Sequence, residues 1–142
     1  MKKIVLSLVS ALLMIVSFSS FAKADVNPLK EKDSKSVMIA YVETVVYGYD
    51  AYHKYLFADD FEYRNSVSND KFSKKQYLKF LKATKGFKFD CESNYKIMDE
   101  TGKSCIAKAT LTFPTFTRVD YITLNKSDEG WKVSKVVSTY PQ

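Results

Sequence analysis

Asp120 is the residue of this 142-residue chain best placed to do chemistry, because its carboxylate falls on an apolar strand face. Alternation along residues 119–126 places Asp120 on the same side as Ile122 and Leu124. A carboxylate in apolar surroundings can have a raised pKa and exchange protons as a general acid or base next to a carbonyl group. It can equally accept hydrogen bonds from a tyrosine, from Arg118 or from backbone amides, and so hold its strand in place. We favour this structural role, because buried ion pairs also perturb carboxylates.

Aromatic side chains form the second set of candidates, since the chain holds 10 tyrosines and 10 phenylalanines. Their rings offer large apolar surfaces, and tyrosine adds a hydroxyl that can hydrogen-bond a ligand. The same spacing is also typical of an ordinary core, so a ligand cavity and a filled interior both remain open. The inward-directed side chains that we predict to contact a small apolar or aromatic ligand are Tyr41, Tyr63, Tyr77, Leu111, Phe113, Leu124 and Trp131.

The remaining residue types indicate no further site. His53 is the only histidine, and we expect it at the surface near the rim of the pocket, since no nucleophile with an orienting acid accompanies it. Phosphate-binding glycine loops and nucleophile motifs are absent from the sequence. Asp59, Asp60 and Glu62 lack the loop of a cation site and are expected to be solvated. We therefore expect no metal and no cofactor.

The two cysteines give conflicting indications. An exported chain with two cysteines favours a disulfide. However, a hairpin turning at Asp99–Gly102 would place Cys105 opposite roughly Ile97, with Cys91 six residues further away. That separation is on the order of 20 Å, far beyond the ~7 Å that a disulfide allows between α-carbons. We lean toward two free, buried thiols, and a bridged pair would mean a different register.

The N-terminus reads as a secretory signal peptide over residues 1–24. Two lysines follow Met1, residues 4–16 are almost continuously apolar, and Ala22-Lys23-Ala24 offers a cleavage site. The apolar run is shorter than the about 20 residues that span a bilayer, so we expect no membrane span in the mature form. The mature chain is expected to be secreted or to enter a bacterial periplasm.

Charge and length limit the mature protein to one modest domain without a nucleic-acid partner. Cleavage leaves 118 residues and removes three lysines but no acidic residue, so the formal charge falls from +6 to +3. The remaining lysines are scattered, whereas nucleic-acid binding favours a basic stripe within a recognisable module. Residues 25–33 lack periodicity and are predicted to form a flexible arm, which leaves residues 34–142 for the single domain.

Helical signals dominate the first half of that domain. Apolar residues recur at spacings of three and four from Val37 to Tyr49, which predicts a helix with one buried face. A second, short helix is predicted over Ala51–Phe57, and a strand over Phe61–Val67. Ser73 opens a third helix, with Gln76 completing a capping box.

The rest of the chain alternates as strands of an antiparallel sheet. The strands are predicted over residues 89–97, 105–113, 116–126 and 131–137, and Pro114 ends or bends the second of them. Helices followed by long strands, with helices on one face of the sheet, indicate an α+β architecture.

In this order of elements, the chain resembles the nuclear transport factor 2-like superfamily, and within it the exported putative lumazine-binding family. The resemblance covers nearly all of residues 34–138. It rests on these residues: Ala40-Tyr41-Val42-Glu43, Gly48-Tyr49-Asp50, Leu56-Phe57, Gly102, Ala107-Lys108-Ala109, Asp120-Tyr121, Leu124, Lys126 and Trp131-Lys132-Val133.

The resemblance implies a cone-shaped fold, in which a strongly curved antiparallel sheet wraps around about three helices and encloses a pocket. The superfamily includes isomerases, dehydratases, cyclases, binding modules and subunits without catalytic activity. We favour an exported small-molecule-binding or accessory domain that can pair as a homodimer through its convex sheet. The alternative is a ketosteroid isomerase-, dehydratase- or cyclase-like enzyme that uses Asp120 as general acid or base.

Overall fold

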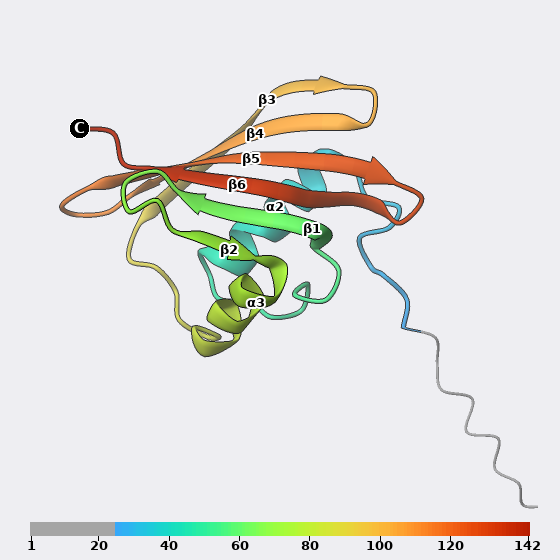
Figure 1. Cartoon of the computed structure of the whole chain (residues 1–142), viewed down its shortest axis with the longest axis horizontal. Coiled ribbons are helices and arrows are strands. Elements are labelled where there is room, and N and C mark those ends of the chain that lie inside the picture. The colour runs from blue at the N-terminus through green and yellow to red at the C-terminus, as the bar shows by residue number, and fades with distance from the viewer. Residues whose placement is uncertain (1–24) are drawn as a thin grey trace, which may run out of the picture.

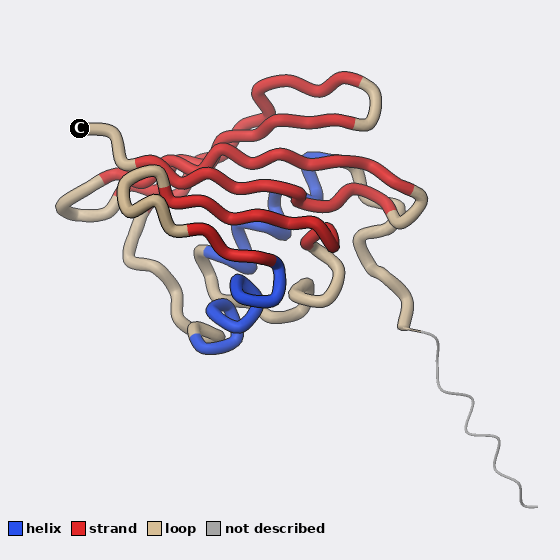
Figure 2. The backbone as a smooth tube through the Cα atoms, in the orientation of Figure 1, coloured by secondary structure: helices blue, strands red, loops and turns tan. Residues whose placement is uncertain are grey.

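A curved, six-stranded sheet with two helices on one face makes up the part of the chain that the structure, a computed structural model, describes, residues 25–142 (Figure 1). The predicted signal peptide lies outside these residues. The α+β prediction is confirmed, and Figure 2 shows α2 passing behind the strands and α3 lying below them. The elements are α2 (Ser34–Val45), β1 (Phe57–Asn65), β2 (Lys71–Ser73), α3 (Lys74–Ala83), β3 (Glu92–Thr101), β4 (Ser104–Thr112), β5 (Thr117–Ser127) and β6 (Gly130–Thr139).

The strands are arranged in the order β2-β1-β6-β5-β4-β3. Strands β3 to β6 form an antiparallel meander, as their alternation predicted. The prediction of a wholly antiparallel sheet is wrong for β1, which pairs with β6 in parallel, with Tyr63 opposite Val136. Strand β1 belongs early in the chain and β6 is the last strand, so the long intervening chain supplies the crossover that a parallel pair requires.

Helix α2 buries the predicted apolar face, including Val37, Met38 and Tyr41, and Asp33 caps it by accepting a hydrogen bond from the amide of Ser36. The helix ends at Val45, shortly before Gly48, the residue expected to interrupt it.

The predicted helix over Ala51–Phe57 is absent, which leaves two helices in the described residues instead of about three. Residues 51–55 form successive turns instead. Leu56 accepts a hydrogen bond from the amide of Val133, and Phe57 begins β1. Pairing with β6 therefore overrides the local helical tendency.

Helix α3 carries the predicted capping box. The hydroxyl of Ser73 accepts from the amide of Gln76, and the Gln76 side chain accepts from the amide of Ser73. The short strand β2 directly precedes this helix and was not predicted. Its three residues are exposed and carry little periodicity, so pairing with β1 is what defines it.

The β3–β4 hairpin turns at residues 102–103, three residues beyond the start of the predicted turn at Asp99. Strand β3 continues to Thr101 through an irregularity between Ile97 and Asp99, which places Cys105 opposite Glu100. Both cysteines are free, as we expected, but only Cys105 is buried, whereas Cys91 is half-buried.

Residues 25–33, predicted to form an arm, lie against the β5–β6 hairpin. Leu29 is buried, and the Asn27 side chain donates a hydrogen bond to the backbone carbonyl of Glu129. Within residues 25–142, no helix is both long enough and apolar enough to cross a membrane.

Candidate functional site

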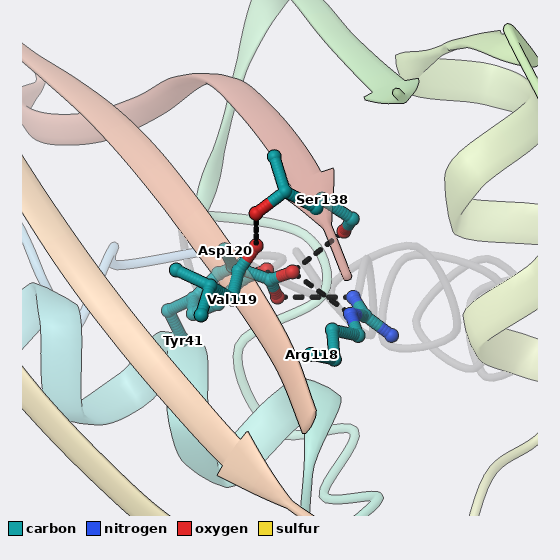
Figure 3. Close-up of polar contacts among 6 residues, drawn as sticks. Tyr41, Arg118, Val119, Asp120 and Ser138 are labelled. Atoms are coloured by element: carbon teal, nitrogen blue, oxygen red, sulfur yellow. Dashed lines mark hydrogen bonds and ion pairs between the residues drawn. The ribbon is translucent and has the colours of Figure 1, made fainter. Parts of the chain in front are cut away.

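Arg118 and Asp120 form an ion pair within strand β5 (Figure 3). The guanidinium Nε lies 2.8 Å from one carboxylate oxygen of Asp120, and Nη2 lies 2.9 Å from the other. Residues two apart on a strand share a face, so the strand itself brings the two groups together. Their side chains are 13% and 1% exposed, and the pair is therefore almost fully removed from water.

Two further donors complete the surroundings of the Asp120 carboxylate. The Ser138 hydroxyl donates to Oδ1 at 2.5 Å, from the β6 position directly opposite Asp120. The Tyr41 hydroxyl of α2 donates to Oδ2 at 2.9 Å. The carboxylate thus accepts four hydrogen bonds from three elements, which confirms the predicted partnership with a tyrosine and Arg118. A carboxylate can be buried when hydrogen bonds of this kind replace those it would make to water.

Burial and the Asp120 charge set the protonation of the surrounding groups. Burial alone would lower the pKa of Arg118, but the charge and hydrogen bonds of Asp120 raise it above its ordinary value. Burial, followed by the Asp120 charge, raises the pKa of Tyr41 well above 10.0. At neutral pH, Arg118 is therefore a cation and Tyr41 keeps the proton that it donates.

A cavity of about 230 Å³ lies beside Arg118, which is one of its lining residues. Its lining residues come from the end of α2, from β1, β2, the middle of α3 and the beginning of β5, and from the segments just before β2 and just after β6. Its walls are mainly aromatic, with two acidic or basic side chains among them. The lining residues are Val45, Tyr63, Asn65, Asp70, Phe72, Tyr77, Phe80, Arg118 and Tyr140.

The aromatic side chains in the cavity wall stack on one another. The ring of Tyr63 stacks on Phe72 at 5.7 Å and 9° and on Tyr77 at 5.1 Å and 17°. The hydroxyl of Tyr77 is buried and has no hydrogen-bond partner among the described residues. Burial raises the pKa of Tyr77, so this hydroxyl stays protonated. An unpaired buried hydroxyl costs free energy.

The structure separates the predicted site residues into two groups. Tyr63 and Tyr77 line the cavity, and Tyr41 lies behind the ion pair. The other predicted ligand-binding residues lie elsewhere: Leu111, Leu124 and Trp131 are buried in the core, and Phe113 is half-buried and stacks on Phe116.

The prediction of a surface position for His53 is wrong, because the side chain is 9% exposed. Burial, as the largest influence, lowers its pKa below 6.5. The short helix that would have presented this residue to solvent is absent. His53 lies outside the cavity lining. Within residues 25–142, no three histidine, cysteine or acidic side chains are grouped as a metal site would require.

Sequence reasoning did not place Phe72, Phe80 and Tyr140 at the site. Phe72 belongs to the unpredicted strand β2, and Tyr140 follows β6, where periodicity ends. Arg118 was expected only as a partner of Asp120. Its position two residues before Asp120 on the same strand face was the available signal that it would lie at the same site.

A family model described as putative lumazine-binding matches residues 30–139 of the chain. Among curated proteins, none matches the sequence.

Several solved structures share the fold. A nuclear transport factor 2-like protein of unknown function from Silicibacter pomeroyi is 10% identical, with a TM-score of 0.61 over 75% of this chain and 92% of that one. A similar protein of unknown function in nutrient uptake from Rhodospirillum rubrum is 13% identical, with a TM-score of 0.61 over 78% and 99%. A putative ketosteroid isomerase from Parabacteroides distasonis is 11% identical, with a TM-score of 0.59 over 82% and 94%. At these identities the likeness concerns the fold.

Proposed function

The chain belongs to the putative lumazine-binding family, and we propose that it is a small-molecule-binding protein whose ligand occupies the cavity beside Arg118. The observation that carries this proposal is the cavity lining. Stacked aromatic rings form its walls, and the guanidinium of Arg118, a largely buried cation, provides N–H hydrogen-bond donors. Apolar walls with a few convergent polar groups are typical of small-molecule sites.

Binding is favoured over catalysis by the surroundings of Asp120. Its two oxygens already accept four hydrogen bonds, two of them from a guanidinium that remains charged. A general base needs a free lone pair directed at the proton it removes. The role that we propose for Asp120 is therefore to position and neutralise Arg118. The general acid/base hypothesis stays a prediction, and no observation of the cavity favours it.

Ligand titration of the mature protein followed by ¹H–¹⁵N NMR tests the proposal. Single-ring aromatic compounds and lumazine, which the family description suggests, are suitable probes. We expect saturable shifts at the amides of Tyr63, Phe72 and Tyr77, with dissociation constants on the order of a millimolar or below for small rings. Shifts confined to other surfaces, or none at all, would reject the cavity as a binding site.

A matched pair of variants localises the binding. Phe72→Ala removes one of the stacked rings of the cavity wall. It should weaken the binding of aromatic probes by about fivefold, because aromatic pairs contribute about 0.5–1.5 kcal/mol beyond burial. Phe87→Ala removes a similar, 68% exposed ring that does not line the cavity and should leave affinity unchanged. Equal effects of the two substitutions would argue against the proposed position.

We propose in addition that the protein acts after export, which the apolar leader and its Ala22-Lys23-Ala24 sequence support. The expected product of expression in a bacterial host is a periplasmic or secreted protein whose N-terminal residue is Asp25. Recovery of the full-length chain from the cytoplasm alone would contradict this proposal.

A further inference from the structure

We propose that the cavity selects neutral ring compounds that carry a carbonyl oxygen and discriminates against the corresponding carboxylates. This inference rests on the proposed function, that the cavity binds a small molecule, and adds the chemical class of the ligand. It follows from the donors, the charges and the volume of the cavity.

The hydrogen-bond donors at the cavity favour a ligand that carries an oxygen acceptor. Asp120 occupies the Nε and Nη2 side of the guanidinium, and the other terminal nitrogen of Arg118 points away from Asp120 (Figure 3). Arginine has five N–H donors and no acceptor, so several donors remain unused. Arg118 is also one of the residues that line the cavity, so these unused N–H groups belong to the cavity wall. A ligand without an oxygen acceptor would leave these groups unpaired.

The charges at the cavity disfavour an anion. Arg118 and Asp70 are the charged side chains of the lining, and Asp120 lies directly behind Arg118. One cation and two carboxylates leave the site with a formal charge of −1. A bound carboxylate would share Arg118 with Asp120 and be repelled by this buried acid, in surroundings where charge interactions are stronger than in water. Exposed Asp70 adds a weaker repulsion that water and salt screen. A carbonyl oxygen accepts the same hydrogen bonds without that repulsion.

The volume and shape limit the ligand to about one substituted ring. A cavity of about 150 Å³ is known to hold benzene, so about 230 Å³ accommodates a ring with a small substituent. The walls formed by Tyr63, Phe72 and Tyr77 offer ring faces and edges for offset stacking. Benzamide, benzoate and toluene are therefore matched probes of carbonyl, carboxylate and bare ring.

The experiment measures the affinity of these three probes at pH 7 from NMR shifts of the cavity amides. Benzamide should bind at least about tenfold more tightly than benzoate, a ratio that corresponds to about 1.4 kcal/mol, and more tightly than toluene. Asp70→Asn, at an exposed lining residue, should raise benzoate affinity several-fold and so reduce the benzamide-to-benzoate ratio. Asp128→Asn, at an exposed acid outside the lining, is the control and should change neither.

Asp120→Asn tests the charge balance directly, because it leaves Arg118 as an unneutralised cation. This variant should bind benzoate more tightly than benzamide, reversing the preference. If it does not fold, the benzamide-to-benzoate ratio of the unsubstituted protein and its response to Asp70→Asn still decide the matter.

Each outcome is informative. Equal or tighter binding of benzoate to the unsubstituted protein overturns the charge preference, and toluene binding as tightly as benzamide overturns the role of the donors. In both cases the cavity is still a binding site. If none of the three probes shifts the cavity amides and lumazine also fails, the proposed function falls and this inference falls with it.

Discussion

Arg118 holds Asp120 through both carboxylate oxygens, with N–O distances of 2.8 and 2.9 Å, and the two residues are separated by a single residue of β5. The ion pair is therefore local to one strand, whereas the remaining partners of Asp120 come from α2 and β6. One buried carboxylate consequently links the long helix, the strand that contains it and the last strand. It also holds Arg118, which lines the cavity.

The two buried tyrosines near this carboxylate should respond differently to loss of their hydroxyls. Tyr41→Phe removes a hydrogen bond to a buried charge and should lower the free energy of unfolding by about 1.5–3 kcal/mol. Tyr77→Phe removes a hydroxyl without a partner and should be neutral or stabilising. Urea denaturation followed by Trp131 fluorescence measures both. Equal losses in the two variants would contradict the hydrogen-bond assignment.

Two glycines at hairpin turns separate backbone strain from steric contact. Gly102 has φ 58° and open space where a Cβ would lie, so Gly102→Ala should cost about 1–2 kcal/mol for the left-handed conformation alone. Gly130 has φ 91°, and a Cβ there would lie 2.5 Å from the Lys30 carbonyl oxygen. Gly130→Ala should therefore cost clearly more, as measured by thermal unfolding. A smaller loss at Gly130 would mean that residues 25–33 do not pack there in solution.

His53 should make the protein less stable as pH falls from 7 to 5. Burial is the main reason that its pKa in the folded protein lies below 6.5. As pH falls below 6.5, the unfolded chain binds a proton that the folded chain resists, so the free energy of unfolding decreases. His53→Gln should flatten the dependence in this window, because the chain has no other histidine. An unchanged slope in the variant would assign the effect to another group.

The cysteines should behave as two thiols of different accessibility. Cys105 is 1% exposed and Cys91 is half-buried, and burial raises the pKa of both. Iodoacetamide at pH 8 should therefore modify native Cys91 first and leave Cys105 protected. Mass spectrometry of unreduced, unfolded protein should find both thiols labelled. Labelling of neither residue under those conditions would indicate a disulfide.

Local signals predicted the elements that depend on neighbouring residues. The capping box of Ser73 and Gln76 marked the start of α3 because both of its hydrogen bonds span only three residues. Alternation along β5 likewise predicted that Asp120 faces inward, since strand geometry alone decides the side of each residue. The helix predicted over Ala51–Phe57 failed because its final residues pair with β6, a contact that no nearby residue encodes.

By itself, the sequence determined the class of fold, the apolar faces of the helix and strands, and the presence of an acid on one of those faces. These features follow from periodicity and hydrogen bonds over a few residues. Only the tertiary structure decided that Ser138 and Tyr41 reach that acid, that β2 brings Phe72 onto Tyr63, and that the cavity opens at Arg118. The physical reason is that these contacts join residues distant in the chain, where register and packing select partners that local patterns leave open.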